Sequence, residues 1–280
     1  MRPEPAGCVT SVQGARTALA LLPRRRPATL PGREPAGRTV TVDREHLARY
    51  DRVCGFRLTD TLPATYPHVL AFPLALRLMS APDFPLPLAG LVHVANRITV
   101  LRPIDAGTPL DHTVHAADLR PHHRGRQFDI VATVVADGVQ AWRGVSTYLC
   151  RERRGERRDP GGQPERPAAS ARWTVPPRVG TDYAAVSGDH NPIHTSRLGA
   201  RLFGFPRPIA HGMWSEARCL AALEGRLPER YSVDVAFRLP ILLPAAVAFT
   251  ATPAGTGWDF TLRSAGGDRV HLTGSTTAPH

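Results

Sequence analysis

An internal repeat is the feature of this sequence that most limits the folds open to it. The segments Thr39–Val42 and Tyr50–Gly55 are paralleled much later, in the same order, by Trp173–Val175 and Tyr183–Gly188. Two more short strings recur at a similar spacing: Arg102–Ile104 as Leu239–Ile241, and Arg143–Thr147 as Thr273–Thr277. The offsets of roughly 130 to 137 residues are much longer than the period of a solenoid repeat. The sequence therefore predicts two copies of one domain.

The repeat divides the 280-residue chain into two predicted domains and two arginine-rich stretches. We expect the domains at residues 39–150 and 173–280, an Arg- and Pro-rich N-terminal arm at 1–38, and an Arg-, Pro- and Gly-rich linker at 151–172. In the arm, an apolar patch at 18–22 precedes a run of arginines, which is the reverse of the order in a signal peptide. We therefore expect the arm to pack a few leucines on the body of the protein.

Each predicted domain shows one helical pattern followed by a run of strands. Apolar residues at helical spacing cover 70–79 in the first copy and 213–223 in the second. Segments rich in β-branched and aromatic residues then predict strands at 92–101, 112–117, 127–135 and 139–148, and at 231–239, 246–251, 258–263 and 270–276. This order is typical of the α+β class.

The net charge of +11 comes from arginine alone, because none of the 35 basic residues is a lysine. These arginines are densest in the arm and the linker and accompany no base-reading motif, so we expect no nucleic-acid partner. A few of them suit the phosphates of a coenzyme A or acyl-carrier group. No apolar run approaches the roughly eighteen residues of a membrane span. The four cysteines lie far apart, which predicts neither a zinc site nor a disulfide framework and is typical of a reducing cytoplasm.

The stretch from Tyr183 to Met213 holds the most chemistry in the chain. Asp189 and His194 stand five positions apart, which on an unbroken helix would turn their side chains about 140° away from each other. Pro192 biases Asn191 away from the helical region and makes a turn there. The chain can then fold back, so that the carboxylate and the imidazole hold one water between them.

The end of the same stretch supplies backbone N–H groups that can lie opposite that water. A helix that begins near Gly212, after the chain breaks at Pro206 and Pro208, would direct free backbone N–H groups and a positive dipole end outward. A carbonyl oxygen that gains negative charge would be stabilised there.

These residues resemble the hydratase motif of the MaoC-like, R-specific enoyl-thioester hydratases. The matching positions are Tyr183, Ser187–Asp189, Asn191–Pro192, His194, Phe203–Gly204 and Ala210–Met213. The resemblance implies a double hot-dog fold, in which each antiparallel sheet wraps a central helix. It also implies that Asp189 and His194 form the catalytic pair, that the Gly212 N–H donates to the thioester oxygen, and that no metal or redox cofactor is needed.

Four further residues of the motif are candidates for substrate binding: Ser187, Asn191, His211 and Met213. Ser187 lacks the G-x-S-x-G context of a nucleophile, so a hydrogen bond at the helix end is the favoured role. Asn191 suits the shaping of its own turn as well as it suits substrate contact. A metal bound by Asp189, His194 and His211 is a less favoured alternative to the metal-free site.

The first copy lacks this chemistry. After Gly55 the sequence has no counterpart of Asp189 or His194, and His68 is interpreted as a loop or packing residue. Another histidine group, His112, His115, His122 and His123, is interpreted as surface residues rather than a metal cluster. We expect the first copy to complete a binding tunnel, so that one chain is a pseudo-dimer; a homodimer of such chains stays open.

The sequence therefore predicts a hydratase that interconverts trans-2-enoyl and (3R)-3-hydroxyacyl thioesters, carried on coenzyme A or a carrier protein, in fatty-acid or related acyl metabolism. In that mechanism Asp189 and His194 orient one water while Gly212 stabilises an enolate-like oxygen. Two alternatives stay open. A hot-dog thioesterase would direct the water at the thioester carbonyl, and a non-catalytic acyl-binding or scaffold subunit would need no chemistry.

Overall fold

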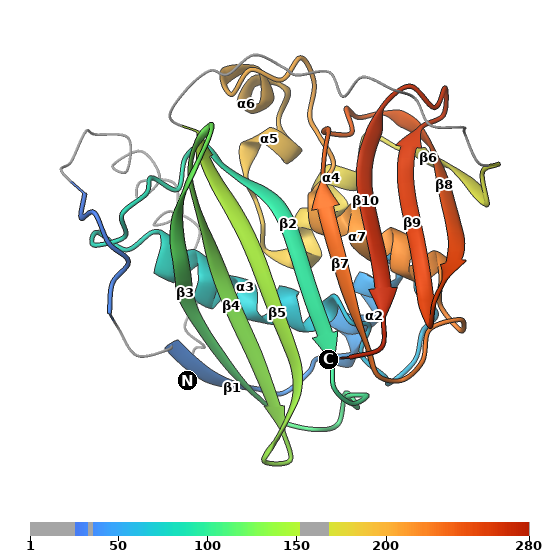
Figure 1. The fold of residues 1–280 in the computed structure, drawn as a ribbon, viewed down its shortest axis with the longest axis horizontal. Coiled ribbons are helices and arrows are strands. Elements are labelled where there is room, and N and C mark those ends of the chain that lie inside the picture. The colour runs from blue at the N-terminus through green and yellow to red at the C-terminus, as the bar shows by residue number, and fades with distance from the viewer. Residues whose placement is uncertain (1–25, 33–35, 152–167, 280) are drawn as a thin grey trace, which may run out of the picture.

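The strands of both copies join into one curved antiparallel sheet in the computed structural model, which describes residues 26–32, 36–151 and 168–279 (Figure 1). The ten strands follow the order β1-β3-β4-β5-β2-β7-β10-β9-β8-β6. Those of the first copy are β1 (Ala36–Val40), β2 (Leu91–Val100), β3 (Leu110–His122), β4 (Gly125–Ala136) and β5 (Val139–Arg151). Those of the second are β6 (Ala171–Val175), β7 (Tyr231–Phe237), β8 (Ala245–Ala254), β9 (Gly257–Ser264) and β10 (Val270–Thr277).

The strand order of the second copy mirrors that of the first. Each copy places its first short strand at an edge of the sheet and its second strand at the centre, where β2 and β7 pair. The helices of the first copy are α2 (Arg44–Cys54) and α3 (Tyr66–Met79); those of the second are α4 (Val179–Ser187), α5 (Pro192–Thr195), α6 (Arg197–Leu202) and α7 (Gly212–Ala222). The fold is the predicted double hot dog of the α+β class, with α3 and α7 as the central helices (Figure 1).

The first helix of each copy ends in the same way. Gly55 follows α2 at φ 84° and Gly188 follows α4 at φ 74°, both in the left-handed region that closes a helix and that glycine adopts at least cost. Tyr50 and Tyr183, the repeated tyrosines, are both buried, and their ring centroids lie 6.3 Å apart. The repeat in the sequence thus corresponds to a repeat in local structure.

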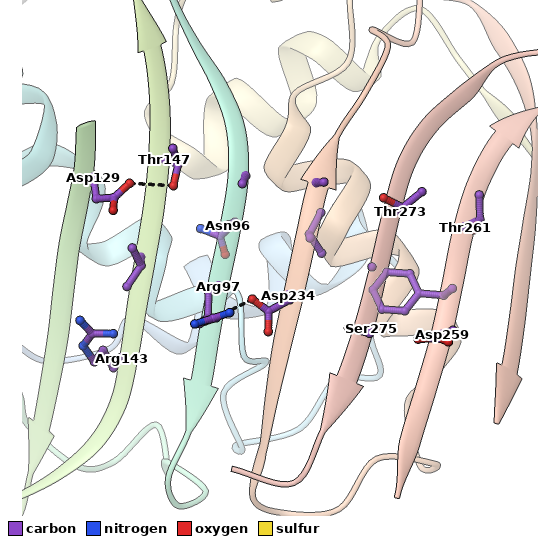
Figure 2. Close-up of a pocket in the computed structure, with 16 residues that line it drawn as sticks. Asn96, Arg97, Asp129, Arg143, Thr147, Asp234, Asp259, Thr261, Thr273 and Ser275 are labelled. Atoms are coloured by element: carbon purple, nitrogen blue, oxygen red, sulfur yellow. Dashed lines mark hydrogen bonds and ion pairs between the residues drawn. The ribbon is translucent and has the colours of Figure 1, made fainter. Parts of the chain in front are cut away.

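The outer face of the sheet is polar where the copies meet. Arg97 of β2 pairs with Asp234 of β7 in the central ladder, and their side chains form an ion pair of 2.5 Å. These side chains alternate with Ile98 and Val233, which face the helices. An open groove of about 810 Å³ follows this outer face (Figure 2). None of the predicted site residues lines it.

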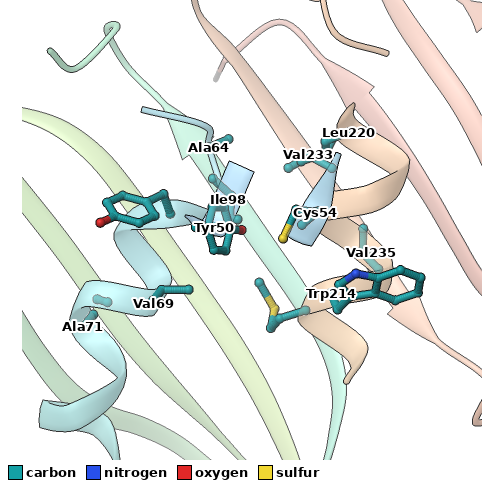
Figure 3. Close-up of a cluster of buried hydrophobic side chains, with 14 of the residues drawn as sticks. Tyr50, Cys54, Ala64, Val69, Ala71, Ile98, Trp214, Leu220, Val233 and Val235 are labelled. Carbon is teal, nitrogen blue, oxygen red and sulfur yellow. The ribbon is translucent and has the colours of Figure 1, made fainter. Parts of the chain in front are cut away.

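The inner face carries one hydrophobic core that both copies build. Tyr50, Val69 and Ile98 of the first copy gather beside Trp214 and Val233 of the second (Figure 3). The indole N–H of Trp214 donates a hydrogen bond of 3.0 Å to the backbone carbonyl of Val53 in α2. Because side chains and a hydrogen bond cross between the copies, each copy depends on the other for part of its core.

Several elements extend beyond their predicted bounds. β1 begins at Ala36, inside the predicted arm, and β6 begins at Ala171, inside the predicted linker. α3 begins at Tyr66 because a proline at the start of a helix loses no hydrogen bond there. The apolar patch at 18–22 lies outside the described residues. Among the described helices, none is long and apolar enough to cross a membrane.

The structure decides two histidine interpretations. His68 is a packing residue and not a loop residue, since it belongs to the first turn of α3 and its ring lies beside those of Phe72 and His93. The interpretation of His112 needs correction. His112 is not a surface residue, because it is fully buried on the inner face of β3 and burial lowers its pKa to about 4. The alternation of inward and outward residues separates His112 from His115 as predicted, but it is the inward member that lies in the core.

Candidate active site

A tight turn after α4 brings the predicted catalytic pair together. The carboxylate of Asp189 accepts a 3.2 Å hydrogen bond from the backbone N–H of Asn191, whose own side-chain oxygen accepts one of 3.3 Å from the N–H of Ile193. Asn191 thereby caps α5, and Pro192 occupies the first helical position. This reversal places the ligand atoms of Asp189, His194 and His211 all within 4.8 Å of one another.

His194 is held in one orientation by the backbone. It is 9% exposed, and its Nδ1 lies 2.8 Å from the carbonyl oxygen of Ile209, to which Nδ1–H donates. This bond leaves Nε2 without the hydrogen, so Nε2 can accept a proton. Burial lowers the pKa of His194 below its usual value, while the charge of Asp189 opposes that shift. The imidazole is therefore neutral at neutral pH.

His211 supports this arrangement from the N-cap of α7. Its Nε2 donates a 3.0 Å hydrogen bond to the backbone carbonyl of Asp189 and lies 3.9 Å from the carboxylate of that residue. Its ring stacks on that of His194 with centroids 3.6 Å apart. Burial, then the neighbouring His194, holds the pKa of His211 well below its usual value. A neutral His211 thus holds Asp189 and His194 in position.

Gly212 is the first residue of the eleven-residue helix α7, so its backbone N–H has no acceptor within the helix. A Cβ at this position would lie 3.2 Å from the ring of Phe237, so that ring would have to shift by a few tenths of an ångström to accommodate it. The N–H, at the positive end of the helix, adjoins His211 and hence the predicted catalytic pair.

The remaining predicted residues have less direct positions. The hydroxyl of Ser187, which is buried, accepts a 3.2 Å hydrogen bond from the Asp189 N–H at the helix end, the role that the sequence favoured. Asn191 is exposed and shapes the turn. Met213 is 5% exposed and belongs to the hydrophobic core.

The group of Asp189, His194 and His211 also has the spacing of metal ligands. However, His194 Nδ1 and His211 Nε2 are engaged with backbone carbonyls. Only the other nitrogen of each ring is then free to bind a metal or a water.

Two side chains of the first copy lie within electrostatic reach of this site, which the sequence did not reveal. Burial lowers the pKa of His68 to about 4 and raises that of Tyr148, and in both cases the charge of Asp189 is the next cause. Both side chains therefore lie within electrostatic reach of Asp189. The sequence gives only a weak sign that His68, which follows Tyr66-Pro67, lies near the site, and it gives no such sign for Tyr148, a tyrosine in a strand. The packing between the two copies decides where both side chains lie.

Comparison with known proteins places the chain in a family. The model of the MaoC-like domain matches residues 161–256. The 3-hydroxyacyl-thioester dehydratase X of Mycobacterium tuberculosis is 37% identical over 274 residues, which cover 96% of this chain and 97% of that protein. This chain belongs to the MaoC-like dehydratase family.

This MaoC-like chain is also similar to solved structures. A crystal structure of HtdX from M. tuberculosis matches with a TM-score of 0.78 and 36% identity, covering 87% of this chain and all of that one (100%). An acyl-ACP thioesterase from Bacteroides thetaiotaomicron matches with a TM-score of 0.58 and 10% identity, covering 86% and 96%. The second likeness is one of fold alone. The fold therefore does not separate dehydration from thioester hydrolysis, and the site must do so.

Proposed function

We propose that this protein is a 3-hydroxyacyl-thioester dehydratase that interconverts trans-2-enoyl and (3R)-3-hydroxyacyl thioesters. The observation that carries the proposal is the cluster of Asp189 and His194 beside the start of α7, in a member of the MaoC-like dehydratase family. A carboxylate and a neutral imidazole can together hold a water and move its proton. The Gly212 N–H suits the oxygen that gains charge when the thioester becomes enolate-like.

The direction of hydration illustrates the chemistry. Asp189 and the Nε2 of His194 orient one water, whose oxygen bonds to the β-carbon of the enoyl group. The electron pair of the double bond moves to the α-carbon and the thioester oxygen, next to Gly212. The α-carbon then takes a proton, so one water is added and no redox change occurs. Dehydration reverses each step.

The proposal is tested by offering the purified protein a series of trans-2-enoyl-CoA thioesters. Hydration removes the enoyl absorbance without release of free thiol, whereas a thioesterase releases thiol. Chiral analysis of the product identifies the 3R isomer. The same assay after dialysis against EDTA is expected to give unchanged rates, because the proposed proton transfers need only side chains. Thiol release without loss of the double bond, or loss of activity that added metal restores, would contradict the proposal.

A further inference from the structure

The short helix α6 presents apolar side chains to solvent, next to the helix that carries His194 (Figure 1). Leu198 is 69% exposed and Leu202, one turn later, is 77% exposed, so both lie on one outward face. Phe203, directly after the helix, is 46% exposed. Three of the five exposed large hydrophobic side chains among the described residues thus fall within six positions of the sequence. Single exposed leucines are common on protein surfaces, but a cluster of this kind indicates a binding surface.

Arginines accompany this apolar cluster. Arg197 and Arg201 are one turn apart on the neighbouring face of α6, and Arg207 follows in the loop that leads to α7. All three are exposed, and among the described residues none of them belongs to an ion pair. The sequence between Asp189 and Glu216 contains no acidic residue, so this stretch carries positive charge without a compensating acid. The term α6 surface denotes six residues: Arg197, Leu198, Arg201, Leu202, Phe203 and Arg207.

The α6 surface is joined rigidly to the proposed catalytic histidine. Gly199, on the buried side of α6, packs so closely on α5 that a Cβ there would lie 2.4 Å from the side chain of Pro192. The chain then returns to α5, where the N–H of Ile209 donates to the carbonyl of Ile193 and the carbonyl of Ile209 accepts from the ring of His194. A partner that docks on α6 is therefore held at a fixed distance from His194.

The composition of this surface distinguishes between candidate occupants. Free coenzyme A would engage the arginines through its phosphates and leave the apolar side chains uncovered. A second copy of this chain, with its net charge of +11, would place arginines against arginines in a symmetric contact. A membrane-binding helix buries a continuous apolar face, whereas α6 has only six residues. A small acidic protein that carries the acyl group on a phosphopantetheine arm fits both properties, because its acidic side chains pair with the arginines and its apolar ones cover the leucines.

We propose that the α6 surface docks an acidic acyl-carrier protein, which delivers the enoyl or 3-hydroxyacyl group to the pair of Asp189 and His194. The preferred substrates are thus carrier-bound thioesters, whereas coenzyme A thioesters react without the docking contact. Docking beside α5 raises the effective concentration of the thioester at the end of the phosphopantetheine arm. The inference rests on the dehydratase function proposed above and specifies the carrier of the acyl group for the same site.

The test compares two substrates with the same trans-2-octenoyl group, one on a bacterial acyl-carrier protein and one on coenzyme A. At low salt, kcat/KM is expected to be at least about tenfold higher for the carrier-bound substrate, because opposite charges speed the encounter and the apolar contact prolongs it. This advantage is expected to shrink severalfold in about 0.5 M sodium chloride, since salt screens exposed charges. An equal kcat/KM for the two substrates at low salt would overturn the inference.

Substitutions on α6 separate docking from catalysis. The double variant Leu198→Ser/Leu202→Ser removes the apolar contact, and a second double variant, Arg197→Glu/Arg201→Glu, reverses the charge. Each is expected to lower kcat/KM for the carrier-bound substrate at least about tenfold and to leave kcat/KM for octenoyl-CoA within about threefold. All four side chains are exposed, so the fold does not depend on them.

The matched control lies at the opposite end of the molecule, where β5 and β7 begin (Figure 1). Val139→Ser/Arg230→Glu changes one exposed apolar side chain and one exposed arginine there. This variant is expected to keep the wild-type ratio of the two substrates. A control that loses the carrier advantage as fully as the α6 variants would show that the overall charge attracts the carrier, and would overturn the inference.

The outcomes also distinguish this inference from the proposed function. If octenoyl-CoA is hydrated and the α6 variants change both substrates equally, the dehydratase function stands and the inference falls. If neither substrate is hydrated, the proposed function falls and the inference falls with it. Sedimentation with anionic phospholipid vesicles tests the membrane alternative. Vesicle binding that Leu198→Ser/Leu202→Ser abolishes, without any change in the kinetics of the carrier-bound substrate, would assign the surface to a membrane and overturn the inference.

Discussion

At the scale of residues, Asp189 and His194 have different supports. The carboxylate is held by the turn at Asn191, and the imidazole by the carbonyl of Ile209. We expect Asp189→Asn and His194→Gln each to lower kcat for hydration at least about a hundredfold, the size expected for loss of a positioned acid or base, with little change in thermal stability. Steady-state kinetics and a melting curve measure this. The neighbouring exposed His190→Gln serves as control, and near-normal turnover by either soluble variant would reject the pair.

Glu216 is a buried residue that should make stability depend on pH. It lies in α7, fully buried, and neither carboxylate oxygen has a partner among the described residues. Burial, with a contribution from the charge of Asp234, raises its pKa to about 8. In the unfolded chain a glutamate has a pKa of about 4.3. Between these two pKa values the unfolded chain ionises Glu216 and the folded chain does not. The free energy of unfolding is therefore highest below about pH 4 and falls as the pH rises toward 8.

The substitution Glu216→Gln is expected to remove this dependence. The free energy of unfolding of the native protein should fall by roughly 3 kcal/mol more than that of the variant between pH 5 and pH 8. Urea unfolding at both pH values measures the difference. Glu229→Gln, at an exposed position, should follow the native protein. Parallel pH profiles for Glu216→Gln and the native protein would show that Glu216 is ionised in the fold.

At the scale of elements, the contact between α4 and α5 positions His194. A Cβ on Gly180 of α4 would lie 2.1 Å from the backbone oxygen of His194, closer than any real contact. Gly180→Ala is therefore expected to push α5 away from α4 and to lower hydration at least about tenfold. Ala185→Ser, on the exposed side of the same helix, is the control. Wild-type kinetics for Gly180→Ala would mean that α5 shifts without consequence for the site.

The sequence predicted α3, α7 and the eight long strands because their signals are local, but it expected one helix per copy where the described residues form two and four. The alternation of residues located the eight long strands, and the Asn191-Pro192 turn was visible from proline alone. A β-bulge at Val94 of β2 has no such signal, since one additional residue in a strand depends on pairing with β5. For the same reason the inward direction of His93 could not be predicted. The burial of His112 was also missed. A histidine counts as a polar residue in the alternation of a strand, and only packing decides whether its side chain is buried.

At the scale of the whole molecule, the two copies should form one active site per chain. Asp189 and His194 come from the second copy, while His68 and Tyr148 of the first lie within electrostatic reach of Asp189. Calorimetric titration with a tight-binding, non-reacting thioester analogue is expected to saturate at about one ligand per chain. The isolated second copy, residues 168–280, should be inactive, because it loses the pairing of β7 with β2 and the bond from Trp214 to Val53. Two ligands per chain, or an active isolated copy, would contradict this.

The repeat in the sequence was enough to predict two domains, but not how they combine. Similar strings at a fixed spacing indicate similar structures, and the mirrored strand order agrees. The shared core could not be predicted in this way, because contacts such as that of Trp214 with Val53 join residues 161 positions apart. No local pattern encodes such a contact, and the residues of the first copy near Asp189 were missed for that reason.

The ion pair between Arg97 and Asp234 has a consequence for the symmetry of the fold. The two residues are 137 positions apart, within the range of the repeat offsets, and they face each other in the central ladder. Equivalent positions therefore meet on an approximate two-fold axis. In a dimer of identical subunits, a residue on the axis faces its own copy, and arginine would face arginine. Opposite charges can occupy this position only because the two copies differ in sequence. At this position the arginine of a first copy attracts the aspartate of a second copy, whereas two first copies would bring two arginines together and repel each other.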